Sequence, residues 1–131
     1  MPKILYVEDN FQNYRLVMRM LTLEGQDFEV FQALDGATAL RLVAELRPDL
    51  ILMDINLPDI DGAEVTRRLR ADSDLGRIPI VAITANAMVG DREQYLAAGC
   101  DDYLRKPFSR DDLRRIVLRF CNGSSTQEPG H

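Results

Sequence analysis

The chain has 131 residues and a formal net charge of -5 at pH 7, with 46% hydrophobic and 28% charged residues. These values are typical of a single globular domain with its own hydrophobic core, and they exclude a fibrous or wholly disordered chain. The acidic excess disfavours a nucleic-acid surface, and no apolar run approaches the roughly 20 residues of a membrane span. We therefore expect a cytoplasmic protein that binds neither nucleic acid nor membrane.

Short apolar runs alternate with amphipathic segments along the chain. Helices are predicted after Asn10, Asp35 and Gly62, between residues 89 and 99, and after Ser109, where Asn10 and Ser109 can act as N-caps. The first helix should turn five residues toward the core, namely Phe11, Tyr14, Val17, Met18 and Leu21. The predicted strands cover residues 4–7, 28–30, 50–54, 80–83 and 103–104.

Strands that alternate with helices predict an α/β fold in which right-handed crossovers place helices on both faces of a parallel sheet. The second strand alternates apolar and polar residues and belongs at an edge, which gives a flavodoxin-like, doubly wound five-stranded sheet of order 2-1-3-4-5 with five helices. We assign residues 1–121 to this domain. The polar segment 122–131 is expected to be a disordered C-terminal tail.

Three carboxylates end neighbouring strands in this order. Asp54 follows the apolar run 50–53, and Glu8 and Asp9 follow the first strand. Alone, Asp54 would be explained as a loop aspartate that accepts nearby backbone N–H groups. Three close carboxylates, however, repel one another unless a cation binds among them, and Mg²⁺ prefers such oxygen ligands.

Thr84 and Lys106 end the fourth and fifth strands and bring a hydroxyl and an ammonium to the same edge. A cation, an ammonium and a hydroxyl around one carboxylate suit phosphoryl transfer to that carboxylate, where catalysis is mostly positioning and charge neutralisation. The predicted chemistry is therefore phosphorylation of Asp54.

These residues carry a resemblance to the receiver domain of two-component response regulators, from Lys3 to about Phe120. Each short match is weak alone, but together they occur in order and each at a predicted strand end. The matched segments are Val7–Asn10, Leu52–Pro58 with Asp61–Gly62, Ile83–Ala87, Gly99–Tyr103 and Leu104–Phe108.

The resemblance implies that Asp54 takes a phosphoryl group from a phosphohistidine on a histidine kinase or a histidine phosphotransfer protein. It also implies a Mg²⁺ site formed by the side chains of Glu8, Asp9 and Asp54 with the backbone carbonyl of Asn56. Glu8 could instead lower the local potential without touching the metal. Such a protein catalyses its own phosphorylation and dephosphorylation but is mainly a signalling switch.

The resemblance further implies that Thr84 and Lys106 hold the phosphoryl oxygens and that Tyr103 turns inward when Thr84 moves. Lys106–Pro107 is expected to be a cis peptide. Tyr103 has an alternative interpretation as an ordinary core aromatic, and Thr84 as a plain strand-end hydroxyl. A downstream protein target would bind the fourth helix, fifth strand and fifth helix.

Two settings for such a receiver stay open. The first is a free-standing, DivK-like or chemotaxis-type regulator, and the alternative is a receiver excised from a hybrid histidine kinase, which the run 84–88 resembles. Other functions on this fold fit less well. A flavodoxin needs a phosphate loop where this chain has residues 8–11, and a haloacid-dehalogenase-like phosphatase needs its nucleophile on the first strand and a second aspartate in place of Asn56.

Overall fold

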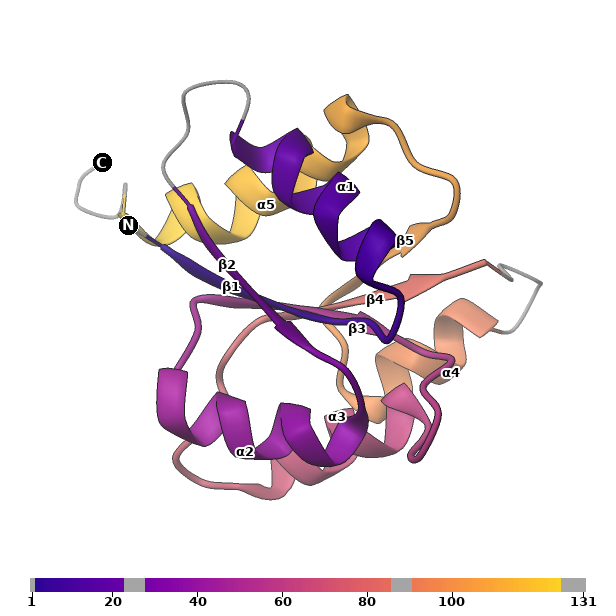
Figure 1. The fold of residues 1–131 in the computed structure, drawn as a ribbon. Coiled ribbons are helices and arrows are strands. Elements are labelled where there is room, and N and C mark those ends of the chain that lie inside the picture. The colour runs from indigo at the N-terminus through magenta and orange to yellow at the C-terminus, as the bar shows by residue number, and fades with distance from the viewer. Residues whose placement is uncertain (1, 23–27, 86–90, 126–131) are drawn as a thin grey trace.

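Parallel strands make the centre of the fold in the computed structural model, which describes residues 2–22, 28–85 and 91–125. Within these residues, helices cover both faces of one five-stranded sheet (Figure 1). The strands are β1 (Lys3–Val7), β2 (Glu29–Ala33), β3 (Leu50–Asp54), β4 (Ile80–Thr84) and β5 (Asp102–Arg105). The helices are α1 (Phe11–Thr22), α2 (Gly36–Leu46), α3 (Gly62–Ala71), α4 (Asp91–Ala98) and α5 (Arg110–Ser125).

The strand order is β2-β1-β3-β4-β5 with every neighbouring pair parallel, so the predicted flavodoxin-like topology is confirmed. Every residue of β3 and β4 is buried, as expected for strands covered on both faces. The strand β2 is only partly buried and lies at the edge, where its alternating pattern placed it. This order brings the ends of β1 and β3 side by side.

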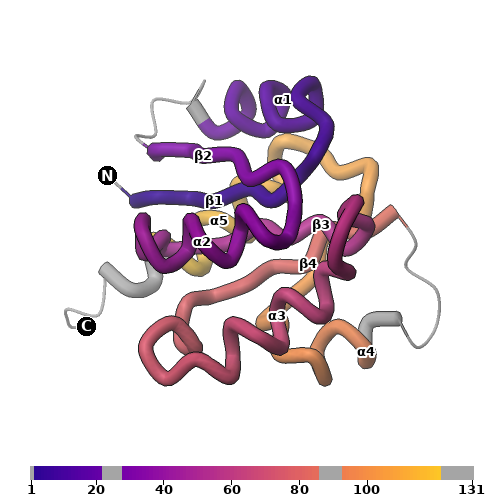
Figure 2. The backbone as a smooth tube through the Cα atoms, turned by 60° about the horizontal axis from the view of Figure 1, so that its bottom comes forward, coloured from indigo at the N-terminus to yellow at the C-terminus, as the bar shows by residue number. Residues whose placement is uncertain are grey.

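Two cores lie on the two faces of the sheet because successive strand residues point to opposite sides. In β1, Leu5 and Val7 join the core under α2 and α3, whereas Ile4 and Tyr6 join the core under α1 and α5. The tube view shows α4 beside α3 on the first of these faces (Figure 2). Among the described residues, no helix is long and apolar enough to cross a membrane.

Side-chain caps fix the starts of three helices at the predicted residues. Asn10 Oδ1 accepts the N–H of Asn13 at 3.0 Å, and Asp35 Oδ1 accepts the N–H of Thr38 at 2.7 Å. Before α5, Ser109 Oγ accepts the Asp112 N–H at 3.0 Å while the Ser109 N–H donates to Asp112 Oδ2 at 3.3 Å. This reciprocal pair is a capping box, formed here with Asp in place of Glu.

Two details differ from expectation. Phe11 was expected to face the core but is 59% exposed, and its ring stacks on that of the half-buried Tyr14, with centroids 6.0 Å apart. The helix α5 also continues to Ser125, past the expected domain end at residue 121. The expected disorder of the tail stays a prediction, since residues 126–131 lie outside the described part of the chain.

Candidate functional site

The carboxyl ends of β1, β3 and β5 bring three charged side chains into contact. Glu8 directly follows β1, Asp54 is the last residue of β3, and Lys106 directly follows β5. The Lys106 ammonium lies 3.2 Å from Glu8 Oε1 and 3.2 Å from Asp54 Oδ2. The two carboxylate residues are almost fully buried, with 2% and 5% of their surfaces exposed, so this is a partly desolvated site in which one cation faces two anions.

Each carboxylate is also held by neutral donors. The backbone N–H of Asn56 donates to Asp54 Oδ1 at 2.9 Å, and the backbone N–H of Asn10 donates to Glu8 Oε2 at 3.2 Å. The buried hydroxyl of Tyr6 donates to Glu8 Oε1 at 3.0 Å, the same oxygen that faces Lys106. These bonds fix both carboxylates before any ligand arrives.

The two carboxyl groups titrate differently. Burial raises the pKa of Asp54 to about 6, and the charge of Glu8 adds to this rise, although the Asn56 N–H and Lys106 oppose it. Burial also raises the pKa of Glu8, but its hydrogen bonds and the nearby Lys106 outweigh burial and leave that pKa below its usual value. At neutral pH both groups are therefore mainly ionised, and the site carries more negative than positive charge.

The predicted cluster of three carboxylates is only partly formed. Glu8 and Asp54 meet through Lys106, whereas the neighbouring Asp9 is exposed. Among the described residues, no group of three or more His, Cys, Asp or Glu side chains is arranged to hold a metal ion. The donor set nevertheless suits Mg²⁺, because the two buried carboxylates exceed the charge of the one ammonium and more oxygen donors follow them in sequence at Asp9 and Asn56.

The Thr84 hydroxyl ends β4 in a buried position, with 1% of the residue exposed. It lies 3.3 Å from the hydroxyl of Tyr95 on α4, a partner that the sequence analysis did not foresee. The one available signal was that Tyr95 is the only aromatic residue in α4, whose apolar stripe is thin. Tyr103 is half-buried on β5 and packs against the same core as Tyr95.

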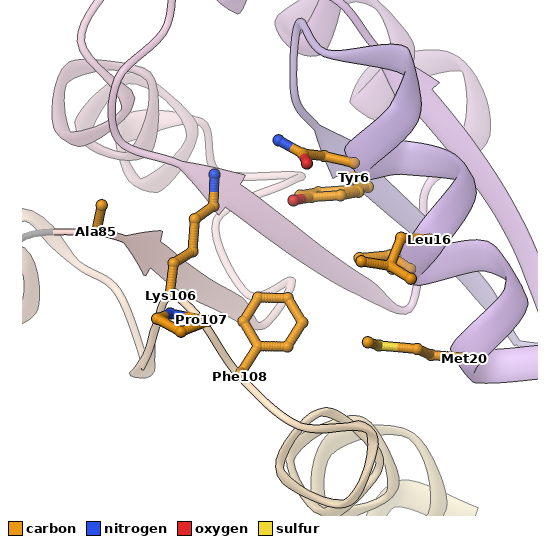
Figure 3. Close-up of a pocket in the computed structure, with 9 residues that line it drawn as sticks. Tyr6, Leu16, Met20, Ala85, Lys106, Pro107 and Phe108 are labelled. Atoms are coloured by element: carbon orange, nitrogen blue, oxygen red, sulfur yellow. The ribbon is translucent and has the colours of Figure 1, made fainter.

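An apolar pocket of about 380 Å³ opens beside Lys106, between α1 and the segment after β5 (Figure 3). Leu16 and Met20 line it from α1, and Phe108 lines the opposite side. The Lys106–Pro107 peptide on this side is cis, as the sequence predicted. Apolar side chains of α1 therefore lie next to the charged site, across this pocket from Lys106.

Comparison with known proteins establishes the family of this chain. Residues 4–118 match the response regulator receiver domain, so the chain belongs to this family. It is 46% identical over 110 residues to the polar-differentiation response regulator DivK of Brucella anthropi. This match covers 83% of this chain and 88% of that protein.

Solved structures agree. The receiver domain of the sensor histidine kinase PA1611 from Pseudomonas aeruginosa, crystallised with a magnesium ion in its active-site cleft, is 45% identical with a TM-score of 0.82, covering 92% of this chain and 98% of that one. The chemotaxis protein CheY4 of Vibrio cholerae is 30% identical with a TM-score of 0.83 and the same coverage. Receivers of this family are phosphoproteins of two-component and phosphorelay signalling.

Proposed function

We propose that this chain is the phosphoacceptor of a two-component or phosphorelay system, with Asp54 as the residue that takes the phosphoryl group. The observation that carries the proposal is the buried Asp54 carboxylate, 3.2 Å from the Lys106 ammonium at the carboxyl end of β3. Receiver domains take phosphoryl groups from histidine kinases and act on downstream targets, and this chain shares their fold and family pattern. Its donor would be a histidine kinase or a histidine phosphotransfer protein.

The transfer is a displacement at phosphorus. A lone pair of one Asp54 oxygen attacks the phosphorus atom, a new O–P bond forms, and the P–N bond to the donor's histidine breaks with its electron pair left on nitrogen. The Asn56 N–H already orients the Asp54 carboxylate at 2.9 Å. Lys106 and Thr84 would bind the oxygens of the transferred group and neutralise the charge that moves onto Asp54.

The proposed cofactor is Mg²⁺. The side chains of Glu8, Asp9 and Asp54 with the backbone carbonyl of Asn56 would hold it, and the ion would supply charge neutralisation at the phosphoryl oxygens. The excess negative charge of the buried carboxylates supports this assignment, as does the magnesium ion in the cleft of the Pseudomonas aeruginosa receiver.

Phosphorylation would act as a switch because it adds about 1.5 to 2 negative charges beside Lys106. Lys106 would then exchange its carboxylate partners for phosphoryl oxygens, while Thr84, Tyr103 and Pro107 adjust around it. The adjoining α4 is weakly anchored, since only Tyr95 and Ala98 are buried among residues 93–98. We propose the surface of α4, β5 and α5 as the one that a downstream protein reads.

The phosphodonor would approach over α1. Phe11 and Leu16 are 59% and 52% exposed on this helix, and the pocket that Leu16 lines reaches Lys106 (Figure 3). Exposed apolar side chains beside a charged centre are typical of a protein contact. A cytoplasmic location is part of this proposal.

The setting of the receiver has two candidates with nearly equal support. The 46% identity to a DivK regulator favours a free-standing receiver, and the 45% identity to the receiver of a sensor histidine kinase favours the alternative of a module from a hybrid kinase. The residues of the run 84–88 beyond Ala85 lie outside the described part of the chain. Both settings use the same chemistry at Asp54.

Intact-mass spectrometry with acetyl phosphate tests the proposal. We expect one phosphate adduct on the wild type, dependent on Mg²⁺ and labile at alkaline pH, and none on Asp54→Asn. The same experiment with a phosphorylated histidine donor should give the same adduct. An adduct that survives in Asp54→Asn, or a wild type that accepts phosphate from neither donor, would contradict the proposed function.

A further inference from the structure

The hydroxyls of Tyr95 and Thr84 form a buried link between α4 and the end of β4. Their oxygens are 3.3 Å apart, and the two residues are 7% and 1% exposed. This separation is longer than the usual O–H···O distance of about 2.7 to 2.8 Å, so the bond between the two hydroxyls can still shorten and strengthen.

Each hydroxyl has one proton, and this fixes how the pair can respond to a ligand. In the structure either oxygen can be the donor. If Thr84 gives its proton to a phosphoryl oxygen on Asp54, it can only accept from Tyr95. The order of donation then becomes Tyr95 to Thr84 to phosphoryl oxygen, or else the link breaks and leaves a buried tyrosine hydroxyl to find another partner.

The position of Tyr95 makes α4 sensitive to whether the Thr84–Tyr95 hydrogen bond is kept or broken. At the far end of the helix, the Arg70 guanidinium donates to the carbonyl of Gly99 at 2.8 Å and to Asp101 Oδ2 at 2.7 Å. That end is therefore held to α3 and to the start of β5. Tyr95 provides a second attachment, nearer the site, and it ends on the hydroxyl proposed to bind the phosphoryl group.

We propose that Tyr95 is a positioning residue that couples Thr84 to α4, so that movement of the Thr84 hydroxyl toward a phosphoryl group is passed directly to the helix. The inference rests on the proposed function, since it needs a phosphoryl group on Asp54. It adds a residue on α4 to the expected switch pair of Thr84 and Tyr103. The Tyr95 hydroxyl oxygen lies 3.3 Å from the Thr84 hydroxyl oxygen, so a shift of the Thr84 hydroxyl acts on Tyr95 directly.

Hydrogen exchange measured by mass spectrometry on the full chain, with and without acetyl phosphate and Mg²⁺, provides the test. The variants are Tyr95→Phe, which removes only the hydroxyl, and Tyr14→Phe as the matched control. The Tyr14 hydroxyl also makes one hydrogen bond, to the Val30 carbonyl at 2.8 Å, but on α1 and away from Thr84. The phosphorylated fraction is read from the intact mass of each sample.

In the wild type and in Tyr14→Phe, phosphorylation should change exchange in the peptide that covers α4. The Tyr95→Phe variant should still take phosphate. The effect of phosphorylation on the opening equilibrium constant of the α4 amides should, however, be roughly 2- to 10-fold smaller than in the wild type, as expected for one lost hydroxyl hydrogen bond. A second measurement needs no substitution: in protein made with 3-fluorotyrosine, the Tyr95 fluorine signal should move on phosphorylation more than that of Tyr14.

The outcomes separate the two proposals. If Tyr95→Phe takes phosphate and α4 responds as in the wild type, or if the Tyr95 fluorine signal does not move, the coupling role is wrong and the proposed function stands. If the wild type itself takes no phosphate from any donor, the proposed function fails and the coupling role fails with it.

Discussion

The Lys106 ammonium lies 3.2 Å from Asp54 Oδ2, so the cation proposed to bind the phosphoryl group is already paired with the acceptor carboxylate. Phosphorylation would therefore exchange one ion pair for another and would not create a new one. The free energy of the switch then depends on the difference between two ion pairs of Lys106, one with the carboxylate and one with the phosphoryl group. A small difference of this kind allows both states to be populated.

Replacing Lys106 by Met should raise the pKa of Asp54 above its value of about 6, because the attraction of the ammonium opposes the effect of burial. The fold should persist, and the response of α4 per phosphorylated molecule should be lost. Carboxyl-carbon NMR titration measures the pKa, and hydrogen exchange measures the response. Lys3→Met is the control, since Lys3 begins β1 at the opposite end of the sheet. An unchanged pKa and an unchanged α4 response would remove the role of Lys106.

Replacing Asp54 by Asn should stabilise the metal-free protein at neutral pH. Folding raises the pKa of Asp54 from 3.8 to about 6, so the folded state favours the protonated form. The Asp54 carboxyl group therefore does not affect the free energy of unfolding at low pH. It lowers that free energy progressively as pH rises from about 4 to 6, and by a constant amount above that range. A pKa change from 3.8 to about 6 limits this loss of stability to about 3 kcal/mol.

Urea unfolding with a chelator present, at several pH values, measures this difference between Asp54→Asn and the wild type. We expect a gain of about 1 to 3 kcal/mol at pH 7.5 that shrinks toward zero near pH 4. A gain that is the same at both pH values would show that the carboxyl group is not held at a raised pKa.

Gly62→Ala should displace the backbone at Asp54 and so slow phosphorylation. A Cβ at Gly62 would lie 2.5 Å from the carbonyl oxygen of Asp54 and 2.9 Å from the Cα of Ile55. The backbone would have to shift at the acceptor residue, at a cost of about 1 to 3 kcal/mol, and the rate of phosphorylation by acetyl phosphate should fall.

The matched control for Gly62 is Gly36→Ala. Both glycines are the first residue of a helix, but a Cβ at Gly36 would meet side chains, at 2.8 Å for Val65 Cγ2 and 3.1 Å for Ile60 Cβ. Thermal unfolding should show a loss of stability in both variants, whereas phosphorylation should slow only in Gly62→Ala. Equal phosphorylation rates in the two variants would contradict this explanation.

Leu16→Ala should slow phosphorylation by a protein donor but not by a small-molecule donor. Leu16 is 52% exposed and lines the pocket beside Lys106, so its loss should lower kcat/KM for a phosphohistidine domain by about fivefold, or ~1 kcal/mol. The rate with acetyl phosphate should not change. Leu34→Ala is the control, because Leu34 is 54% exposed and lies outside the pocket lining. Equal effects of both substitutions on the protein donor would exclude α1 as the docking surface.

The sequence was sufficient where a local pattern determines the structure. The buried runs of β3 and β4, the weak pattern of β2 and the capping side chains of Asn10, Asp35 and Ser109 led to the observed topology and helix starts. Topology then brought Glu8, Asp54 and Lys106 to one edge. Parallel strands align their carboxyl ends, so no side-chain detail was needed for this step.

The sequence was insufficient where the outcome depends on how a helix is rotated or which partner a side chain chooses. Phe11 fits the apolar face of α1, but the packing of α1 against α5 leaves it outside. The Tyr95 hydroxyl contacts Thr84 because of how α4 packs beside α3 and β5, and a thin apolar stripe does not predict that packing. Asp9 lies in the short segment between β1 and α1 and is exposed, whereas the preceding Glu8 is buried beside Lys106.

The central claim, that Asp54 and no other carboxylate accepts the phosphoryl group, is tested most directly by trapping the acyl phosphate. The phosphorylated protein is reduced with borohydride, which converts an aspartyl phosphate to homoserine, and the peptides that contain residues 8, 9, 54 and 59 are sequenced by tandem mass spectrometry. We predict homoserine at residue 54 alone, only when donor and Mg²⁺ were both present. Homoserine at residue 9 or 59, or a reduced glutamate at residue 8, with residue 54 unmodified would contradict the account.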